Sequence, residues 1–458
     1  MNKIITYFFC CLLVCGCGNF LDVMPKGMVI PQTVEDYELI LNDDIVTISN
    51  ITYMDPDIWL PENFLTTKSL PLFNGYTWAD FQYHIDENDP NWDNIYARIY
   101  GLNEIIDHID KAETVTLNEN LRQEVKGQAY AERAKFYFAL INMYAMAYTK
   151  ANRIQPGVPL LLHNDIMQHS SRATIGEVYD QILSDLRIAR KLVPPAVHPT
   201  KKRRASVAGL EGFIAKVYLF LQEPDSALIY SNLALANTPD LSDYNEYIIP
   251  PENVTDIYKK QNMPRYYHLQ DEIIWQGTVT YNFLTSDIFY SEELARLFDQ
   301  KYDLRFNFWA VDKMKNGNQL PGYKYVADHY RTFVTSVPEL LLLRAECYAR
   351  TGKEQLALAD LNTLREKRFL AGSNYRLELS GDKDILELVK EERRRELAFT
   401  GLNWWDLKRY QAYGEQIATF TRHYQKNTYT LKPGDARYVL SIPPYVIDKN
   451  PKIKQNPR

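Results

Sequence analysis

The sequence predicts a mostly α-helical protein: one scaffold of tetratricopeptide-like helix pairs, with long loops and minor β-strands. Three observations favour this fold class. Apolar residues recur with helical spacing over much of the chain. Two helix–turn–helix segments share one pattern of small and apolar residues. The composition, 46% hydrophobic and 24% charged over 458 residues, is globular and excludes a disordered, collagen-like or multi-span membrane chain.

The N-terminal segment has the pattern of an export signal. Lys3 supplies a positive charge, and an apolar stretch follows from Ile4 to Val14, too short to span a bilayer as a helix. It leads into Gly16-Cys17, a small residue before a cysteine, as in a bacterial lipobox. Cleavage between them would leave Cys17 as a lipidated N-terminus. The alternative is a plain secretory signal with incidental cysteines.

We therefore expect three parts: a lipoprotein signal peptide at 1–16, a lipidated N-terminus and tether at 17–32, and a single helical domain at 33–458. Four of the five cysteines precede residue 18, so the mature chain keeps only Cys347 as a free thiol, and a disulfide scaffold is excluded. The net charge of −6 argues against a general nucleic-acid binder, which needs a basic face.

Helical spacing is clear from residue 92 onward. Trp92, Tyr96, Ile99 and Asn103 fall on one helix face, and residues 127–148 form a long helix rich in alanine and aromatic residues. A further helix begins at the capping box from Thr174 to Glu177 and ends before Pro194-Pro195. Its apolar stripe comprises Val178, Ile182, Leu186, Ala189 and Leu192.

Two helix pairs repeat one another at an offset of roughly 130 residues. The first spans 206–221 and 225–236, and the second spans 338–350 and 354–368. Short turns make each pair antiparallel, and small residues let its helices approach closely. The alternative is two ordinary αα-hairpins. The matching positions are Ala215, Tyr218, Ala227, Leu228 and Asn232 in the first pair and Ala345, Tyr348, Ala357, Leu358 and Asn362 in the second.

Residues 43–90 and 240–335 lack helical spacing and carry Pro, Gly, Asn, Asp and many aromatic residues. We interpret them as long loops laid over the helices, with short strands such as 272–280; a further strand is predicted at 438–442. Loops on a rigid scaffold are where binding sites concentrate.

Short motifs follow one another in order almost from end to end of the chain. They are Cys17 with Phe20-Leu21-Asp22 and Pro25; Trp92 to Asn103; Ala131-Glu132-Arg133 with Phe136-Tyr137; Val158-Pro159-Leu160; Glu177-Val178-Tyr179 with Asp185-Leu186; Leu342-Leu343-Arg344-Ala345-Glu346 with Gly352, Ala357, Leu361-Asn362 and Arg365; Glu392-Arg393-Arg394-Arg395-Glu396-Leu397 with Gly401, Trp405-Asp406-Leu407 and Arg409; and Ile442-Pro443 with Asn450-Pro451 and Gln455-Asn456-Pro457.

This series resembles the SusD/RagB family of outer-membrane lipoproteins in Bacteroidetes. The resemblance implies capture of an oligosaccharide at the outer face of the outer membrane by a protein anchored through lipidated Cys17. It also implies delivery of the ligand to a TonB-dependent, SusC-like β-barrel partner, over which this protein acts as a lid. Two positions depart from the family pattern: Thr400, where the family usually has Glu, and Asn403, where it usually has Arg. Either departure could loosen a local ion pair.

The Glu-Arg cluster at 391–396 is predicted to be structural. Glu391 and Arg395 stand at i, i+4 on a helix surface, and Glu396 could pair with Arg409 in a partly buried contact. The adjacent tryptophans Trp404-Trp405 are predicted to lie in the core, beside residues that pack helices.

No catalytic motif is present: HExxH, P-loop, GxGxxG and GxSxG are all absent, and the eight histidines are scattered. We expect no catalytic residue, no cofactor and no metal. Cys347 falls in a predicted packed hairpin, where a thiol is an inert small hydrophobe. The acidic run 86–89, with Asp93, is either a cation site or a solvated turn; it lacks the EF-hand glycine and the terminal glutamate.

Tyrosine is abundant, with 33 copies, and flat aromatic side chains suit the apolar faces of sugar rings, while polar side chains serve the ring edges. Such residues are concentrated in two stretches, 74–83 and 281–290, and on either side of a Gly-Asn turn at 317–318. The first stretch also contains Phe81, and the second also contains Phe289 and Tyr290. The predicted ligand-binding residues are Asn74, Tyr76, Trp78, Tyr83, Tyr281, Asn282, Phe283, Trp309 and Tyr323.

Three alternatives to glycan capture stay open. Peptide binding, as in the RagB branch, predicts extended backbone capture with side-chain pockets. A glycoside hydrolase on a helical scaffold predicts a carboxylate pair in a cleft. A purely structural lipoprotein predicts no ligand.

Overall fold

The computed structural model describes residues 31–42, 46–47, 50–116, 118, 120–165, 170–199, 201–253, 261–262, 271–276, 279–280, 288–313, 322, 324–326, 335–379 and 384–458. Cys17 lies outside this part of the chain. Sixteen α-helices and ten short strands are assigned within it, which confirms the mostly α-helical class. Among these helices, none combines the length and the apolar character needed to cross a bilayer.

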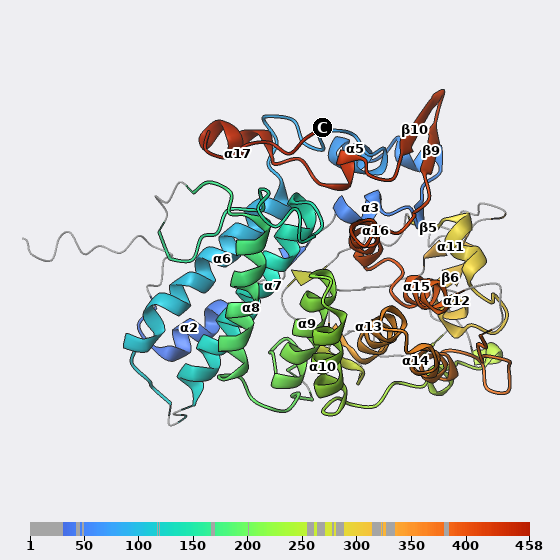
Figure 1. Cartoon of the computed structure of the whole chain (residues 1–458), viewed down its shortest axis with the longest axis horizontal. Helices are drawn as coiled ribbons and strands as arrows, with labels where there is room; N and C mark the ends of the chain where they lie inside the picture. The colour runs from blue at the N-terminus through green and yellow to red at the C-terminus, as the bar shows by residue number, and fades with distance from the viewer. Residues whose placement is uncertain are drawn as a thin grey trace, which may run out of the picture.

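Three long helices form one side of the molecule (Figure 1): α6 (Pro90–His108), α7 (Leu121–Tyr144) and α8 (Ile175–Arg190). The predicted capping box at the start of α8 is present, with Thr174 and Glu177 each bonded to the other's backbone N–H. Helix α7 begins six residues before the predicted start at Gly127 and ends four before the predicted end. A Cβ atom on Gly127 would lie 2.7 Å from Leu192 Cβ, so this glycine permits the close packing of α7 and the end of α8.

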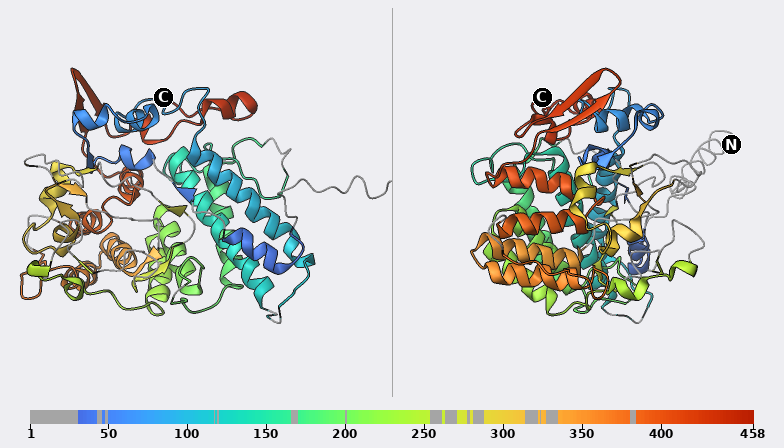
Figure 2. Two further views of the ribbon diagram at one scale, coloured as in Figure 1. Left: turned by 180° about the vertical axis from the view of Figure 1, so that it is seen from behind. Right: turned by 90° about the vertical axis from the view of Figure 1, so that its right-hand side faces the viewer.

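The two predicted helix pairs are confirmed as α9 (Val207–Phe220) with α10 (Pro224–Leu235), and α13 (Val337–Arg350) with α14 (Glu354–Glu366). Although about 100 residues of sequence separate them, α10 packs directly on α13. The two pairs therefore stand next to each other, as the lower part of Figure 1 shows; Figure 2 shows the same helices from two other sides. Helix pairs that are far apart in sequence are thus neighbours in space.

The shorter helices surround these two pairs, and α15 packs on α13 and α14. Three of them lie in 43–90 and two, α11 and α12, lie in 240–335, so the prediction that these two regions lack helix is wrong: helices of one or two turns are too short for a periodic signal. The remaining helices are α2 (Val34–Leu41), α3 (Asn50–Met54), α4 (Glu62–Leu65), α5 (Leu70–Tyr76), α11 (Glu292–Leu297), α12 (Leu304–Trp309), α15 (Ile385–Glu396), α16 (Leu402–Ala412) and α17 (Pro444–Lys449).

The strands are short and scattered, as predicted. An antiparallel four-stranded sheet has the order β2-β5-β7-β6. It is formed by β2 (Ile58–Trp59), β5 (Phe289–Tyr290), β7 (Tyr325–Val326) and β6 (Ala310–Val311). The two-stranded pairs are β1 (Val46–Thr47) with β4 (Val279–Thr280), β3 (Ile273–Trp275) with β8 (Thr335–Ser336), and β9 (Phe420–Tyr424) with β10 (Asn427–Leu431).

The strand predicted at 438–442 is wrong. Tyr438 ends a 3-10 helix that begins at Ala436. The backbone N–H groups beyond it bond elsewhere than to a sheet: Leu440 donates to the Met143 carbonyl of α7, and Ile442 donates to the Gln455 side chain. Its apolar residues, which suggested a strand, instead pack against α7. The β9–β10 hairpin nearby was not predicted from the sequence.

Buried ion pairs tie the later helices together. Glu392 is fully buried and lies within 2.8 Å of the guanidinium groups of Arg305, Arg365 and Arg395. Arg395 thus pairs with Glu392, a buried partner that the sequence did not predict. Arg409, predicted to pair with Glu396, is bonded to two other carboxylates.

The carboxylates of Glu346 and Asp406 accept hydrogen bonds from Arg409. The carboxylate of Glu396 pairs with Arg305 and Arg368. The burial suggested for Glu396 and Arg409 is confirmed, whereas Arg395, predicted on the helix surface, is buried as well, and several partners are more distant in sequence than expected. Trp404 and Trp405 are fully buried, as predicted.

Candidate ligand-binding surface

The four-stranded sheet joins strands from the two aromatic-rich regions that the sequence predicts to be long loops, 43–90 and 240–335. Trp59 on β2 pairs in register with Phe289 on β5, and Phe289 pairs with Tyr325 on β7. Residues 281–283 precede β5 in the chain, and Tyr323 precedes β7. The sheet is therefore where β2, from the region before residue 90, meets β5, β6 and β7, from the region after residue 288.

Four rings pack at this sheet, and we name Trp59, Phe64, Phe289 and Tyr325 the aromatic sheet cluster. Phe289 lies at the centre, with ring centroids 5.4 Å from Trp59, 5.5 Å from Phe64 and 4.2 Å from Tyr325. Phe289 and Tyr325 are buried, whereas Trp59 and Phe64 are half-buried and present part of their surface to solvent. The buried ring of Phe289 therefore positions the half-buried rings of Trp59 and Phe64.

Tyr325 adds a polar group to the cluster. Its hydroxyl is buried and finds no hydrogen-bond partner within the described part of the chain. Desolvation raises the pKa of Tyr325, so the hydroxyl stays protonated and can donate or accept. A buried hydroxyl beside partly exposed aromatic rings suits a ligand with both apolar faces and hydroxyl groups.

The predicted residues Tyr76 and Trp78 lie in the interior, with 2% and 1% of their surfaces exposed. The Trp78 indole N–H donates to the Met54 carbonyl at 2.8 Å, and the Tyr76 hydroxyl accepts from the Leu60 N–H at 3.0 Å. The guanidinium carbon of Arg422 lies 3.9 Å from the Tyr76 ring centroid and 4.3 Å from that of Trp78. Both rings are covered by other parts of the protein in this packing. A contact of either ring with a ligand stays a prediction.

The other predicted residues are spread out. Asn74 is half-buried and donates to the Gln82 carbonyl, and Tyr83 is buried against Asp89. Trp309 belongs to a separate buried cluster around Tyr244. Of the four aromatic residues at 76–83, only Phe81 is well exposed. Tyr281, Asn282, Phe283 and Tyr323 lie outside the described residues.

Trp59 and Phe64 were missed by the sequence analysis. Residues 58–60 form a short apolar run with a tryptophan between Pro56 and Pro61, which is the pattern of a short buried strand. That pattern predicts a strand but no partner. Only the pairing with β5, some 230 residues away, places Trp59 beside Phe289.

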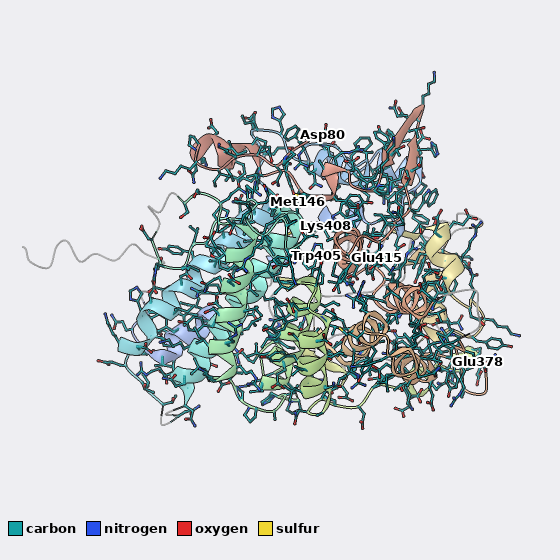
Figure 3. All side chains as sticks on the ribbon, in the orientation of Figure 1. Asp80, Met146, Glu378, Trp405, Lys408 and Glu415 are labelled. Atoms are coloured by element: carbon teal, nitrogen blue, oxygen red, sulfur yellow. The ribbon has the colours of Figure 1, made fainter. Side chains whose placement is uncertain are left out.

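A pocket of about 490 Å³ lies away from the aromatic sheet cluster, where the segment after α7, α16 and the C-terminal segment meet. Met146 and Lys408 line it, and Figure 3 labels both. The Lys408 ammonium donates to the carbonyls of Asn142 and Ala145, and burial lowers the pKa of Lys408 to about 7. The amide side chains in its lining are also bonded within the protein, so the pocket offers a ligand mainly apolar surface. Those amides belong to Asn152, Gln411 and Asn456.

The acidic run at 86–89 is not a solvated turn throughout. Asp89 is buried, caps α6 through the Asn91 N–H, and accepts from the Tyr144 hydroxyl; burial raises its pKa to about 6. Over the described residues, no three His, Cys, Asp or Glu side chains gather as metal ligands would. Cys347 is fully buried, and burial raises the pKa of its thiol, as expected for an inert core residue.

Comparison with known families decides the relationship. Residues 19–219 match a family described as "starch-binding associating with outer membrane", and residues 337–458 match the SusD family. The chain belongs to the SusD/RagB family. This SusD-like chain is 25% identical over 387 residues to SusD-like protein P38 of Formosa agariphila, covering 69% of this chain and 71% of that protein.

Solved structures agree with the SusD-like fold. A SusD superfamily protein from Bacteroides thetaiotaomicron superposes with a TM-score of 0.72 at 19% identity, covering 93% of this chain and all of that one. A laminarin-binding SusD-like protein superposes with a TM-score of 0.61 at 17% identity, covering 92% and 96%. At these identities the superpositions establish the fold alone.

Both departures from the family pattern lie near the start of α16. The Thr400 hydroxyl donates to the Leu397 carbonyl, which closes the turn before the helix. The Asn403 amide donates to the side chains of Asp55 and Asp57, just before β2. Asn403 thus supplies hydrogen bonds without charge beside two carboxylates.

Proposed function

We propose that this SusD-like chain binds an oligosaccharide at the aromatic sheet cluster and passes it to a TonB-dependent β-barrel transporter. The observation that carries the proposal is the packing of partly exposed Trp59 and Phe64 around Phe289, next to Tyr325, whose hydroxyl has no hydrogen-bond partner among the described residues. The laminarin-binding relative of the same fold makes a β-glucan the first ligand to test.

The chemistry of the cluster fits a sugar. Pyranose rings have apolar C–H faces that pack on aromatic rings, and hydroxyl edges that need hydrogen bonds. The predicted residues Tyr281, Asn282 and Phe283 follow β4 in sequence, and Tyr323 precedes β7; as ligand contacts they would add further rings and an amide. The proposed role is capture and release, without catalysis.

The location follows from the N-terminal sequence. Lipidation of Cys17 would hold the protein on the outer membrane, with the tether to residue 32 between the lipid and the folded part. We place the protein on the external face, where it acts as a lid over the transporter. A lid must open to admit ligand, which requires a hinged interface with the barrel.

The proposed function is tested by calorimetric titration of residues 18–458 with laminari-, malto- and xylo-oligosaccharides and with a panel of peptides. Heat with one saccharide class and none with peptides is the expected result. Heat with peptides alone would replace the proposal by peptide capture, and slow cleavage of a bound saccharide would replace it by hydrolysis.

Trp59→Ala should weaken saccharide binding by about 1–3 kcal/mol, roughly a 5- to 150-fold rise in Kd, because it removes a half-buried ring that presents part of its surface to solvent at the proposed site. Titration measures the change, and circular dichroism checks the fold. Phe81→Ala is the matched control, since Phe81 is an exposed aromatic residue outside the cluster. Equal losses in the two variants, or no loss in Trp59→Ala, would place the site elsewhere.

A further inference from the structure

The turn immediately before β2 carries two buried carboxylates. Asp55 and Asp57 have 1% and 0% of their surfaces exposed, and Ile58 and Trp59 follow directly. The Asp57 carbonyl accepts from the N–H of Ser291, the residue after β5. The position of this turn therefore sets the position of Trp59.

Two helices from the other end of the chain hold the turn. Arg394 of α15 donates from Nε to both carboxylate oxygens of Asp57, at 2.7 and 2.9 Å. Asn403 of α16 donates from Nδ2 to Asp55 Oδ1 at 2.7 Å and to Asp57 Oδ2 at 3.1 Å. One amide group thus bridges two carboxylates that cannot both be charged there without repelling each other.

Asp55 has no cation bonded directly to its carboxylate among the described residues. Arg394 is bonded to Asp57, whereas the donors to Asp55 Oδ1 are neutral, the Asn403 amide and the Asp57 N–H. The charge of Arg422 acts on both Asp55 and Asp57, but its guanidinium donates to backbone carbonyls, including that of Asp55 at 2.6 Å. Glu293, whose charge acts on Arg394, adds a further negative group.

Burial, together with the charge of Asp57, raises the pKa of Asp55 to about 7. The proton belongs on Oδ2, because Oδ1 already accepts two N–H bonds. In the unfolded chain an aspartate has a pKa near 4. The released turn therefore gives up its proton more readily than the held turn does, and the held turn loses stability as pH rises from about 4 to about 7.

We propose that the turn from Asp55 to Asp57 is a proton-controlled latch that fixes strand β2, and with it Trp59, to helices α15 and α16. Protonated Asp55 shares the site with charged Asp57, and β2 is held. Ionised Asp55 repels Asp57, and β2 is released more often. The consequence for ligand affinity rests on the proposed function, whereas the motion of β2 does not.

Hydrogen exchange of the backbone amides at 50–60, corrected for intrinsic rates, tests the latch without a ligand. Protection in the native protein should fall by about tenfold or more between pH 5 and pH 7 and level off above pH 7. Asp55→Asn is neutral at every pH, so its protection should stay constant over this range. Equal pH profiles in the two proteins would overturn the latch.

Asn403→Arg gives a second route if Asp55→Asn does not fold. The added cation beside Asp55 should move the fall in protection to lower pH by at least about one pH unit. An unmoved profile would overturn the proposal as well. Exchange at the α7 amides serves as the internal control, because α7 does not contact the turn through any of these groups.

Saccharide affinity gives the functional readout. The Kd of the native protein should rise at least about threefold relative to that of Asp55→Asn between pH 5 and pH 8, because the competent fraction falls. If no saccharide binds at any pH while exchange follows the predicted profile, the proposed function fails and the latch stands. If saccharide binds with the same pH dependence in both proteins, the latch fails and the proposed function stands.

Discussion

Glu392→Gln should lower the free energy of unfolding by about 3–5 kcal/mol, the largest effect expected from a single neutral isostere in this chain. Glu392 is fully buried among the guanidinium groups of Arg305, Arg365 and Arg395, with N–O distances of 2.7 to 2.8 Å. These cations hold the pKa of Glu392 well below its ordinary value. Removing the carboxylate leaves buried positive charge without compensation.

Denaturant unfolding at pH 7 measures this loss. Glu387→Gln is the matched control, because Glu387 lies on the same helix but is exposed, and it should change the unfolding free energy by less than about 1 kcal/mol. Since the lowered pKa stabilises the fold only while Glu392 is charged, the difference between wild type and Glu392→Gln should shrink as pH falls below about 4. A loss under 1 kcal/mol at pH 7 would contradict the role assigned to the cluster.

Arg422→Met should cost about 3 kcal/mol or more and should also weaken saccharide binding. Arg422 is buried on β9 and donates to four backbone carbonyls, three of them in β2 and the residues just before it and one at the end of α5. Burial lowers its pKa to about 10, so it stays charged at neutral pH. Methionine keeps much of the volume but leaves those carbonyls without donors. The four acceptors are Tyr53, Asp55, Ile58 and Tyr76.

Arg422→Lys should restore little of this stability, because one ammonium cannot reproduce the planar set of donors that serves four carbonyls. Arg296→Met provides the surface control, since the Arg296 side chain is 70% exposed. Thermal unfolding and saccharide titration are the two measurements. A stable Arg422→Met protein with unchanged Kd would show that β2 does not depend on this guanidinium.

Much of the scaffold could be predicted because its signals are local. The capping box at Thr174 and Glu177 lies within four residues. Each helix pair can be predicted from the small residues in its own two helices and the short turn between them. The stacking of α10 on α13 could not be predicted this way, since the contact joins segments separated by about 100 residues and depends on how the intervening chain folds back.

The residues of the candidate site were harder to predict from the sequence than the helices were. The surplus of aromatic residues indicates a wet or stacking surface, but it does not say which rings remain open. Trp78 is closed by Arg422, more than 340 residues further along the chain, and Trp59 gains its partners from β5. The partners of buried charges, such as Arg394 with Asp57, are equally distant. Long-range packing, not residue type, decides which aromatic residues can meet a ligand.

Saccharide binding at the aromatic sheet cluster is tested most directly by a crystal structure of residues 18–458 with the saccharide that binds most tightly in the titrations. We expect a sugar ring packed against Trp59, with a sugar hydroxyl within hydrogen-bond distance of the Tyr325 hydroxyl. A saccharide seated instead in the pocket beside Met146 and Lys408, with no contact to the aromatic sheet cluster, would contradict this expectation.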